Sequence, residues 1–367
     1  MHNPFNPSFG KIPPVLLGRK EIREDYEEEL NNPNTPYQTA IVYGMRGVGK
    51  TTFLTEVSQK LSEKEDWLVV DLAMGTNLLE NLIDDLYRKS TSKVQKMLDS
   101  LKGISFSAVG LQISASVGKP TVSTYQGILQ SILTTLTDQG IHVLITIDEV
   151  KATKELRSFA AFYQLLIRKN LFVNLLMTGL PENISELQNE DVLTFLLRSP
   201  RIGLSPLSLF EIKATYKKIF EKSEIKISDK IAGEMAKMTK GYSYAFQLLG
   251  YLAWKDGRET GKITAKMLHQ LLPTYIAELE KNSYSKIYQE FSEKDRLFLK
   301  AMAAINKTTV SITEIRNKMG KSSGYISMYR RRLLDAQVIE SNGYGKVTFT
   351  LPYFKEFIAE MEEFEVE

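Results

Sequence analysis

Cysteine is absent from the 367 residues of the chain, and histidine occurs only at His2, His142 and His269. Without cysteine, the chain can form no disulfide bond, bind no metal through a thiolate and use no thiol as a nucleophile. Three histidines this far apart in the sequence also argue against a histidine-based zinc site. The chemistry of the protein must therefore depend on other side chains.

Long apolar runs are also missing. No run approaches the roughly 20 residues that a helix needs to span a bilayer. The first residues, MHNPFNPSFGKIPP, are rich in proline and asparagine and lack the apolar region of a signal peptide. We therefore expect a cytoplasmic protein with no membrane partner.

The net charge is only +3, but its distribution is uneven. Residues 292–350 contain eleven Lys and Arg against five Asp and Glu, a local net charge of +6. Residues 351–367 contain one Lys against six Glu, a local net charge of −5. Basic charge is therefore concentrated in one C-terminal segment that ends abruptly.

A phosphate-binding loop stands out in TAIVYGMRGVGKTTFLTEVSQKL, where an apolar strand precedes a glycine-rich turn and a helix. Small residues let backbone N–H groups surround phosphates, and a helix N-terminus adds partial positive charge. Lys50 is expected at the β- and γ-phosphates, Thr51 at Mg²⁺ and Thr52 near the α-phosphate. The full set expected at ATP is Gly44, Met45, Arg46, Gly47, Val48, Gly49, Lys50, Thr51 and Thr52.

Acidic residues end the apolar strand HVLITIDEV, about a hundred residues further on. Asp148 is in the position of a second Mg²⁺ ligand, and Glu149 in that of a base that polarises the attacking water. The strand LFVNLLMTGL ends near Thr178, which either orients that water or caps the following turn. Hydrolysis of ATP, and not binding alone, is the expected outcome.

Two arginines follow the last of these strands. Arg198 and Arg201 lie where the chain leaves the α/β core, and either could reach the γ-phosphate of a neighbouring copy. The alternative is an ordinary exposed arginine at each position.

Between the core strands, GISFSAVGLQISASVG alternates about Gly110 as a hairpin does. It has no Lys or Arg between Ile104 and Val117, which favours an insertion shielding the core over a DNA contact.

The order of elements from residue 290 onward is typical of a winged helix: a helix starting at Ser292, a short helix ending at Gly320, a third helix and a hairpin. In the third helix Ile326, Tyr329 and Leu333 share the core face, whereas Arg331 points the opposite way. The expected DNA contacts are Lys321, Ser323, Tyr325, Ser327, Arg331 and Lys346. A winged helix that contacts protein is the alternative.

Taken together, these motifs resemble the AAA+ and STAND-type P-loop ATPases related to origin-recognition initiators. The resemblance covers residues 12–355 and is most specific in the GKT loop, the IDE strand, MTGLPENI and GYSYAFQLLGYLAW. It also includes LLGRKEIREDYEEEL, which implies that backbone near Gly18 and Arg19 lies against the adenine. Related lid helices begin with a motif containing arginine or proline. Residues 241–244 have neither, so no site residue is assigned in this helix.

The resemblance implies an α/β P-loop core with a parallel sheet in three layers, a helical lid and a C-terminal winged helix. The expected divisions are a tail at 1–11, the core at 12–205, the lid at 206–285, and the winged helix with an acidic tail at 286–367. The expected function is an ATP-hydrolysing switch coupled to binding or assembly on double-stranded DNA, with homo-oligomers or a partner protein possible. A STAND-like signalling ATPase and a DNA-translocating motor are the alternatives.

Overall fold

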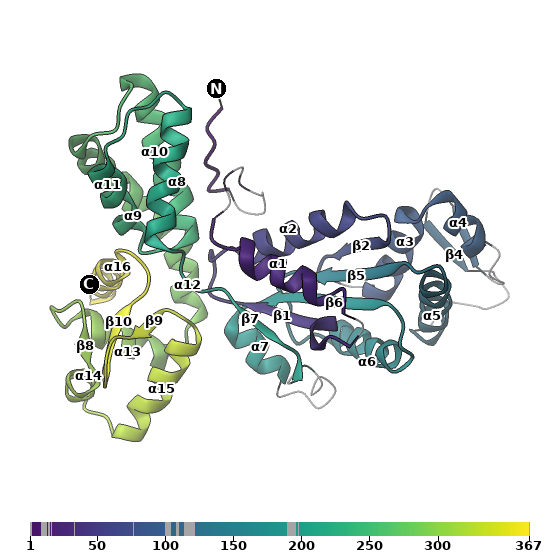
Figure 1. Cartoon of the computed structure of the whole chain (residues 1–367). Helices are drawn as coiled ribbons and strands as arrows, with labels where there is room; N and C mark the ends of the chain where they lie inside the picture. Colours follow the sequence, from purple (N-terminus) through teal and green to yellow (C-terminus); the bar gives the residue numbers. More distant parts are fainter. Residues whose placement is uncertain are drawn as a thin grey trace. The chain divides into compact units, whose positions relative to one another are not determined.

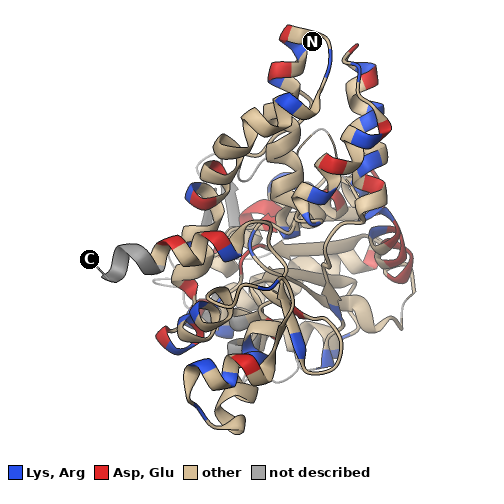
Figure 2. Cartoon of the chain, turned by 90° about the vertical axis from the view of Figure 1, so that its left-hand side faces the viewer, with Lys and Arg blue, Asp and Glu red and all other residues tan. Residues whose placement is uncertain are grey.

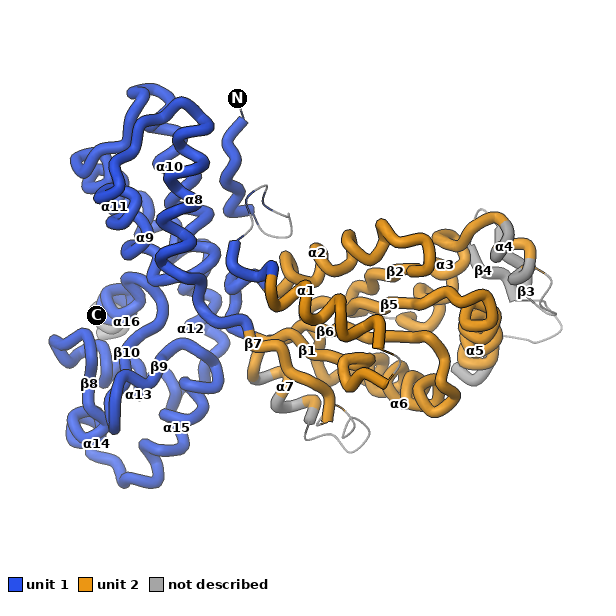
Figure 3. Tube along the Cα trace, viewed as in Figure 1, with its two compact units in different colours: residues 1–20, 44–49, 204–367 blue, residues 21–43, 50–203 orange. Residues whose placement is uncertain are grey.

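A computed structural model describes most of the chain (Figure 1). The described residues are 2–8, 13, 15, 17–32, 34–75, 77–99, 104–107, 110–113, 122–188, 196 and 198–366. The described helices include none long and apolar enough to cross a membrane. Two compact units are distinguished in Figure 3: unit 1 contains residues 1–20, 44–49 and 204–367, and unit 2 contains residues 21–43 and 50–203.

A five-stranded sheet forms the centre of unit 2, and all its strand pairs are parallel. In spatial order the strands are β2 (Trp67–Leu72), β5 (His142–Ile147), β6 (Val173–Gly179), β1 (Thr39–Tyr43) and β7 (Arg201–Gly203). Because parallel strands share a direction, the carboxyl ends of β1, β5 and β6 lie at one edge of the sheet. The prediction of a parallel α/β core is confirmed.

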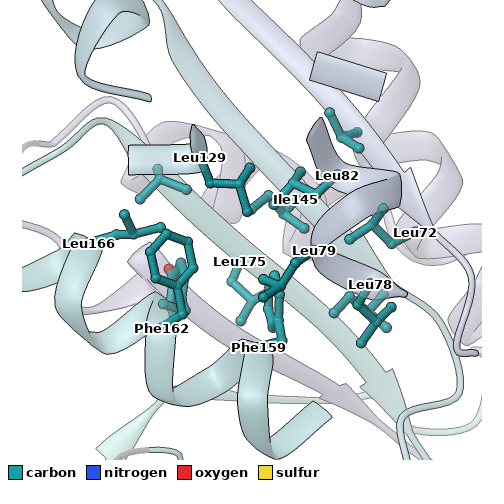
Figure 4. Packing of buried hydrophobic residues seen from close by; sticks show 14 of the residues in the cluster. Leu72, Leu78, Leu79, Leu82, Leu129, Ile145, Phe159, Phe162, Leu166 and Leu175 are labelled. Carbon is teal, nitrogen blue, oxygen red and sulfur yellow. The ribbon is translucent and has the colours of Figure 1, made fainter. Parts of the chain in front are cut away.

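Helices cover both faces of this sheet. The helices of unit 2 are α1 (Lys20–Glu29), α2 (Lys50–Ser62), α3 (Leu78–Lys89), α4 (Ser92–Asp99), α5 (Val122–Asp138), α6 (Lys154–Arg168) and α7 (Pro181–Gln188), with a 3₁₀ turn at Pro36–Gln38. Alternate residues of β5, such as Ile145, join the apolar cluster with α3, α5 and α6 (Figure 4). Thr146 points to the other face, where its hydroxyl and that of Ser58 on α2 both donate to Asp71. The core therefore has three layers.

A small hairpin follows α4. Strands β3 (Ile104–Ser107) and β4 (Gly110–Ile113) pair antiparallel, with Ser107 opposite Gly110. This pairing confirms the hairpin predicted from the alternation about Gly110. Residues 103, 108–109 and 114–118 of the predicted hairpin lie outside the described residues.

A helical bundle forms the first part of unit 1: α8 (Leu209–Lys222), α9 (Asp229–Thr239), α10 (Ser243–Thr260), α11 (Ala265–Leu279), a π-helical turn η4 (Glu280–Tyr284) and α12 (Ser285–Glu290). Its core contains an aromatic cluster in which Tyr216, Phe220 and Phe246 each have ring centroids within 6 Å of Phe5. Gly250 permits this packing, because a Cβ there would overlap the ring of Phe5. Residues 2–8, expected as part of a tail, are thus attached to the bundle.

The remaining elements, residues 292–366, are called the C-terminal segment below: α13 (Glu293–Ala303), β8 (Val310–Ser311), α14 (Ile312–Met319), α15 (Ser323–Asp335), β9 (Ile339–Ser341), β10 (Lys346–Phe349) and α16 (Phe354–Val366). The helix start predicted at Ser292 is confirmed, and α15 has Ser322 as its N-cap; both hydroxyls accept a backbone N–H three residues on. The sequence missed β8, which has only two residues and pairs with β10, and α16, which was taken as an acidic tail.

We expect Phe5→Ala to lower the free energy of unfolding of unit 1 by about 3–5 kcal/mol, because it empties a buried ring site. Chemical denaturation followed by circular dichroism measures this change. Phe210→Ala is the matched control, since the Phe210 ring is 79% exposed and its removal should change stability by less than ~0.5 kcal/mol. Equal losses for both variants would show that Phe5 does not stabilise the bundle.

Candidate nucleotide-binding site

The glycine-rich segment turns sharply after β1. That strand ends at Tyr43 and α2 begins at Lys50, so the loop consists of residues 44–49. Gly47 and Gly49 have φ values of +77° and +102°, which residues with a Cβ rarely adopt. Lys50 is 7% exposed in the first turn of α2, and Thr51 follows it. This is the strand–loop–helix arrangement that the phosphate-loop pattern requires.

The carboxylate of Asp148 joins two hydroxyl groups from different elements of unit 2. Thr51, in the first turn of α2, donates to Asp148 Oδ2 at 2.8 Å. Thr178, at the end of β6, donates to Asp148 Oδ1. The register explains the second contact, because Ile147 and Met177 are paired and the next residues of β5 and β6 are neighbours. The structure thus brings together the two predicted Mg²⁺ ligands, Thr51 and Asp148, on adjacent elements.

Glu149 leaves the sheet in an unusual backbone conformation. Its φ is +51°, a left-handed value that costs a residue with a Cβ about 1–2 kcal/mol. Two hydrogen bonds hold it there: the Glu149 N–H donates to Asp148 Oδ1 at 3.1 Å and to Thr178 Oγ1 at 3.0 Å. Strain of this kind concentrates at functional sites, where surrounding contacts enforce it. Sequence patterns could not have revealed it.

Thr178 is completely buried, and its hydroxyl is engaged on both sides. It donates to the carboxylate of Asp148 and accepts the N–H of Glu149. Its backbone carbonyl also accepts the N–H of Val150 at 2.8 Å. In this structure Thr178 therefore positions both acids.

The donor set of this site fits a magnesium ion. A hydroxyl and a carboxylate 2.8 Å apart are hard oxygen ligands, which Mg²⁺ prefers. Among the described residues there is no cluster of three or more His, Cys, Asp or Glu side chains that could hold a metal by itself. A Mg²⁺ ion held by one or two protein oxygens, with phosphate oxygens completing its shell, is consistent with this composition.

Arg19 is tied to the phosphate loop within unit 1. Arg19 is 8% exposed, and its guanidinium donates to the carbonyl oxygens of Ser205 at 2.6 Å and Val48 at 3.4 Å. Burial lowers the pKa of Arg19, and the nearby charge of Glu211 partly opposes that effect. Gly18 precedes it at a φ of +69°. Of the two residues predicted beside the adenine, Arg19 reaches the phosphate loop through its side chain, and the place of both at the adenine remains a prediction.

The start of α10 contacts the loop directly, which the sequence argument missed. Burial raises the pKa of Tyr242, so its hydroxyl stays protonated and donates to the carbonyl oxygen of Arg46 at 2.9 Å. The Tyr244 N–H donates to the carbonyl oxygen of Gly47 at 3.1 Å. A Cβ on Gly47 would overlap the Tyr242 hydroxyl. The glycine-led motif at 241–244 marks this position in the sequence, and its tyrosines contact the loop where related motifs have an arginine or a proline.

The two arginines predicted to act on a neighbouring copy are both exposed. Arg198 lies in a short helical turn, and Arg201 begins β7, where it is paired with Ile41. The structure therefore places both at the surface of unit 2, and their role remains a prediction.

Five of the six predicted DNA contacts are exposed on the C-terminal segment: Lys321, Ser323, Ser327, Arg331 and Lys346. The sixth, Tyr325, is half-buried. Figure 2 shows the basic residues of this segment interspersed with acidic ones. Lys321 Nζ lies 5.8 Å from the centroid of the Tyr325 ring. Tyr344, which was not among the predicted contacts, is a fully exposed ring at the tip of the hairpin between two glycines.

The three consecutive arginines have different surroundings. The Arg331 side chain is 86% exposed, with the carboxylate of Asp335 3.8 Å away. Arg330 is half-buried and donates to the Ser341 hydroxyl at 3.3 Å. Arg332 forms a 2.7 Å ion pair with Asp295, whose side chain is 2% exposed. Arg332 is thus engaged in holding α15 against α13.

Solved structures with this fold cover nearly all of the chain. A Walker-type ATPase of Pyrococcus abyssi is 14% identical over 94% of this chain and 96% of its own, with a TM-score of 0.56. The ORC2 protein of Aeropyrum pernix in ADPNP–ADP complexes is 11% identical over 98% of each chain, with a TM-score of 0.63. Its ADP form is 13% identical over 98% of this chain and 97% of its own, with a TM-score of 0.51.

The chain therefore has the fold of an AAA+ P-loop ATPase. Within that class, the fold is the one shared with archaeal origin-recognition proteins, as the sequence predicted. A family model described as a domain of unknown function, DUF8462, matches residues 281–358, which include most of the C-terminal segment. Comparison with curated proteins gives no match.

We expect Gly47→Ala to lower the free energy of unfolding of unit 1 by about 2–4 kcal/mol, because the new methyl group meets the Tyr242 hydroxyl at a left-handed φ. Gly261→Ala is the matched control: its φ is +71° and a Cβ there meets nothing within 4 Å. It should cost only the backbone part, about 1–2 kcal/mol. Denaturant titration compares the two, and equal losses would contradict the contact with Tyr242.

Proposed function

We propose that the chain binds ATP with Mg²⁺ at the phosphate loop and hydrolyses it. The observation that carries this proposal is the carboxylate of Asp148, which accepts hydrogen bonds from Thr51 and Thr178 and stands next to Glu149. The nucleotide complexes of the A. pernix ORC2 protein, which shares the fold, support the choice of nucleotide.

In this proposal the Lys50 ammonium offsets negative charge on the phosphates and the loop amides donate hydrogen bonds to them, while bound Mg²⁺ would offset further charge. Glu149 orients the attacking water and accepts its proton. Thr178 fixes both acids through its hydroxyl, so it acts as a positioning residue. Arg198 and Arg201, both exposed, are the candidates to reach the nucleotide of a second copy.

We expect Lys50→Ala to weaken ATP binding roughly 10- to 150-fold, the loss of a charge-assisted bond of about 1.5–3 kcal/mol. Glu149→Gln should keep binding but lower turnover by about 10²-fold or more, because the base is lost. Phosphate release measures turnover, and a fluorescent ATP analogue measures binding. Lys60→Ala and Glu63→Gln, exposed partners of one surface ion pair, are the matched controls. Wild-type values in both site variants would exclude this site.

The C-terminal segment is proposed to be a winged helix that binds double-stranded DNA. Its helices α14 and α15 are joined by a tight turn at Gly320, and β8, β9 and β10 form a three-stranded sheet with an exposed hairpin. Arg331, Ser327 and Lys321 are exposed on or next to α15, the helix expected in the major groove. The excess of basic residues supplies the charge that phosphate contacts require.

We expect Arg331→Ala to weaken DNA binding and to reduce the slope of log affinity against log salt by about one, the loss of one phosphate contact. ATP hydrolysis without DNA should not change. Fluorescence anisotropy with a labelled duplex over a range of salt measures both quantities. Lys294→Ala removes an exposed cation from α13 of the same segment and serves as the control. Unchanged affinity and slope would favour the alternative, a segment that contacts a partner protein.

A further inference from the structure

Gln337 lies in a backbone position that normally belongs to glycine. It follows the last residues of α15 with a φ of +60°, and its N–H donates to the carbonyl oxygen of Leu334 at 2.9 Å. Glycine is preferred directly after a helix in this conformation, because a Cβ costs about 1–2 kcal/mol there. Ending α15 does not by itself explain why this position has a side chain, because glycine would end the helix at lower cost.

The side chain of Gln337 reaches the phosphate loop, which belongs to the same compact unit. Its carboxamide oxygen Oε1 accepts the N–H of Met45 at 3.4 Å. The absence of a side chain on Gly44 makes room for it, since a Cβ there would lie 3.3 Å from the same oxygen. This contact links the loop to a residue that lies 292 positions further along the chain.

Other residues of unit 1 support the same part of the loop. The Tyr242 hydroxyl bonds to the Arg46 carbonyl oxygen and lies 2.6 Å from Ser283 Oγ. The Arg46 guanidinium forms a 3.2 Å ion pair with Glu290, at the end of α12. A helix N-terminus supplies amides that bind phosphate, and α2 begins at Lys50, after Met45 in the chain; the Met45 N–H is assigned to Gln337 and not to the nucleotide. Gln337 can therefore shape the loop without occupying the place of the nucleotide.

We propose that Gln337 is a positioning residue of the nucleotide site, which holds the first part of the phosphate loop in the shape that accepts ATP. This inference rests on the proposed nucleotide binding and goes beyond it, because it makes ATP affinity depend on the C-terminal segment. A ligand that draws α15 away from the loop weakens ATP binding, and by thermodynamic linkage ATP weakens that ligand by the same factor.

The test compares Gln337→Gly with Glu224→Gly in the full chain. Glu224 is an exposed residue with a φ of +59° directly after Ser223, the C-cap of α8, so both variants relieve the same kind of backbone strain. Neither should lower the melting temperature. Only Gln337→Gly should weaken binding of a fluorescent ATP analogue with Mg²⁺, by about 2- to 10-fold, the range for loss of one hydrogen bond.

Gln337→Asn gives an independent check, since asparagine tolerates left-handed φ but is one methylene too short to reach Met45. It should weaken ATP binding as much as Gln337→Gly does. Wild-type affinity in both Gln337 variants, with binding lost in Lys50→Ala, would overturn this inference and leave the proposed function intact. Wild-type affinity in Lys50→Ala would instead overturn the nucleotide site itself. Equal weakening in Gln337→Gly and Glu224→Gly would also overturn the role of Gln337.

Discussion

The Tyr242 hydroxyl occupies the space that a side chain on Gly47 would fill, and it bonds to the Arg46 carbonyl oxygen. This one contact requires glycine at residue 47 and a buried tyrosine at the start of α10. Burial raises the pKa of Tyr242, so its hydroxyl stays protonated and can donate this bond. The shape of the phosphate loop is therefore set partly by the helical bundle, and not by β1 and α2 alone.

A second constraint acts where the loop continues into α2. There the Thr51 hydroxyl meets Asp148, whose other oxygen is bound by Thr178. The same threonine accepts the N–H of Glu149 and so maintains its left-handed backbone. A single buried hydroxyl thus fixes the relative positions of a metal-ligand candidate and a base candidate. Such preorganisation is what charge stabilisation in phosphoryl transfer needs.

Features encoded by neighbouring residues were predictable from the sequence. The phosphate loop, the acidic strand end, the Ser292 cap and the stop at Gly320 each depend on a few consecutive side chains. Features that join distant residues were not. The ion pair of Arg332 with Asp295 spans 37 positions, and the bond of Tyr242 to Arg46 spans 196. The two-residue strand β8 depends on its pairing with β10. Helix α16 is stabilised by the burial of Phe354 and Ile358.

The same distinction explains why the arginine run is not a uniform basic surface. Helical periodicity places Arg331 outward, and its 86% exposed side chain agrees with that. Periodicity alone could not show that Arg332 compensates the carboxylate of Asp295, which also accepts the N–H of Ser292 in its capping box. Removing Arg332 would leave a buried charge without that partner, a larger cost than the loss of a surface ion pair. Charge counts over the segment therefore overstate the basic charge that is free for the proposed DNA contact. Arg331, with a side chain 86% exposed against 52% for Arg332, is the most exposed arginine of the run.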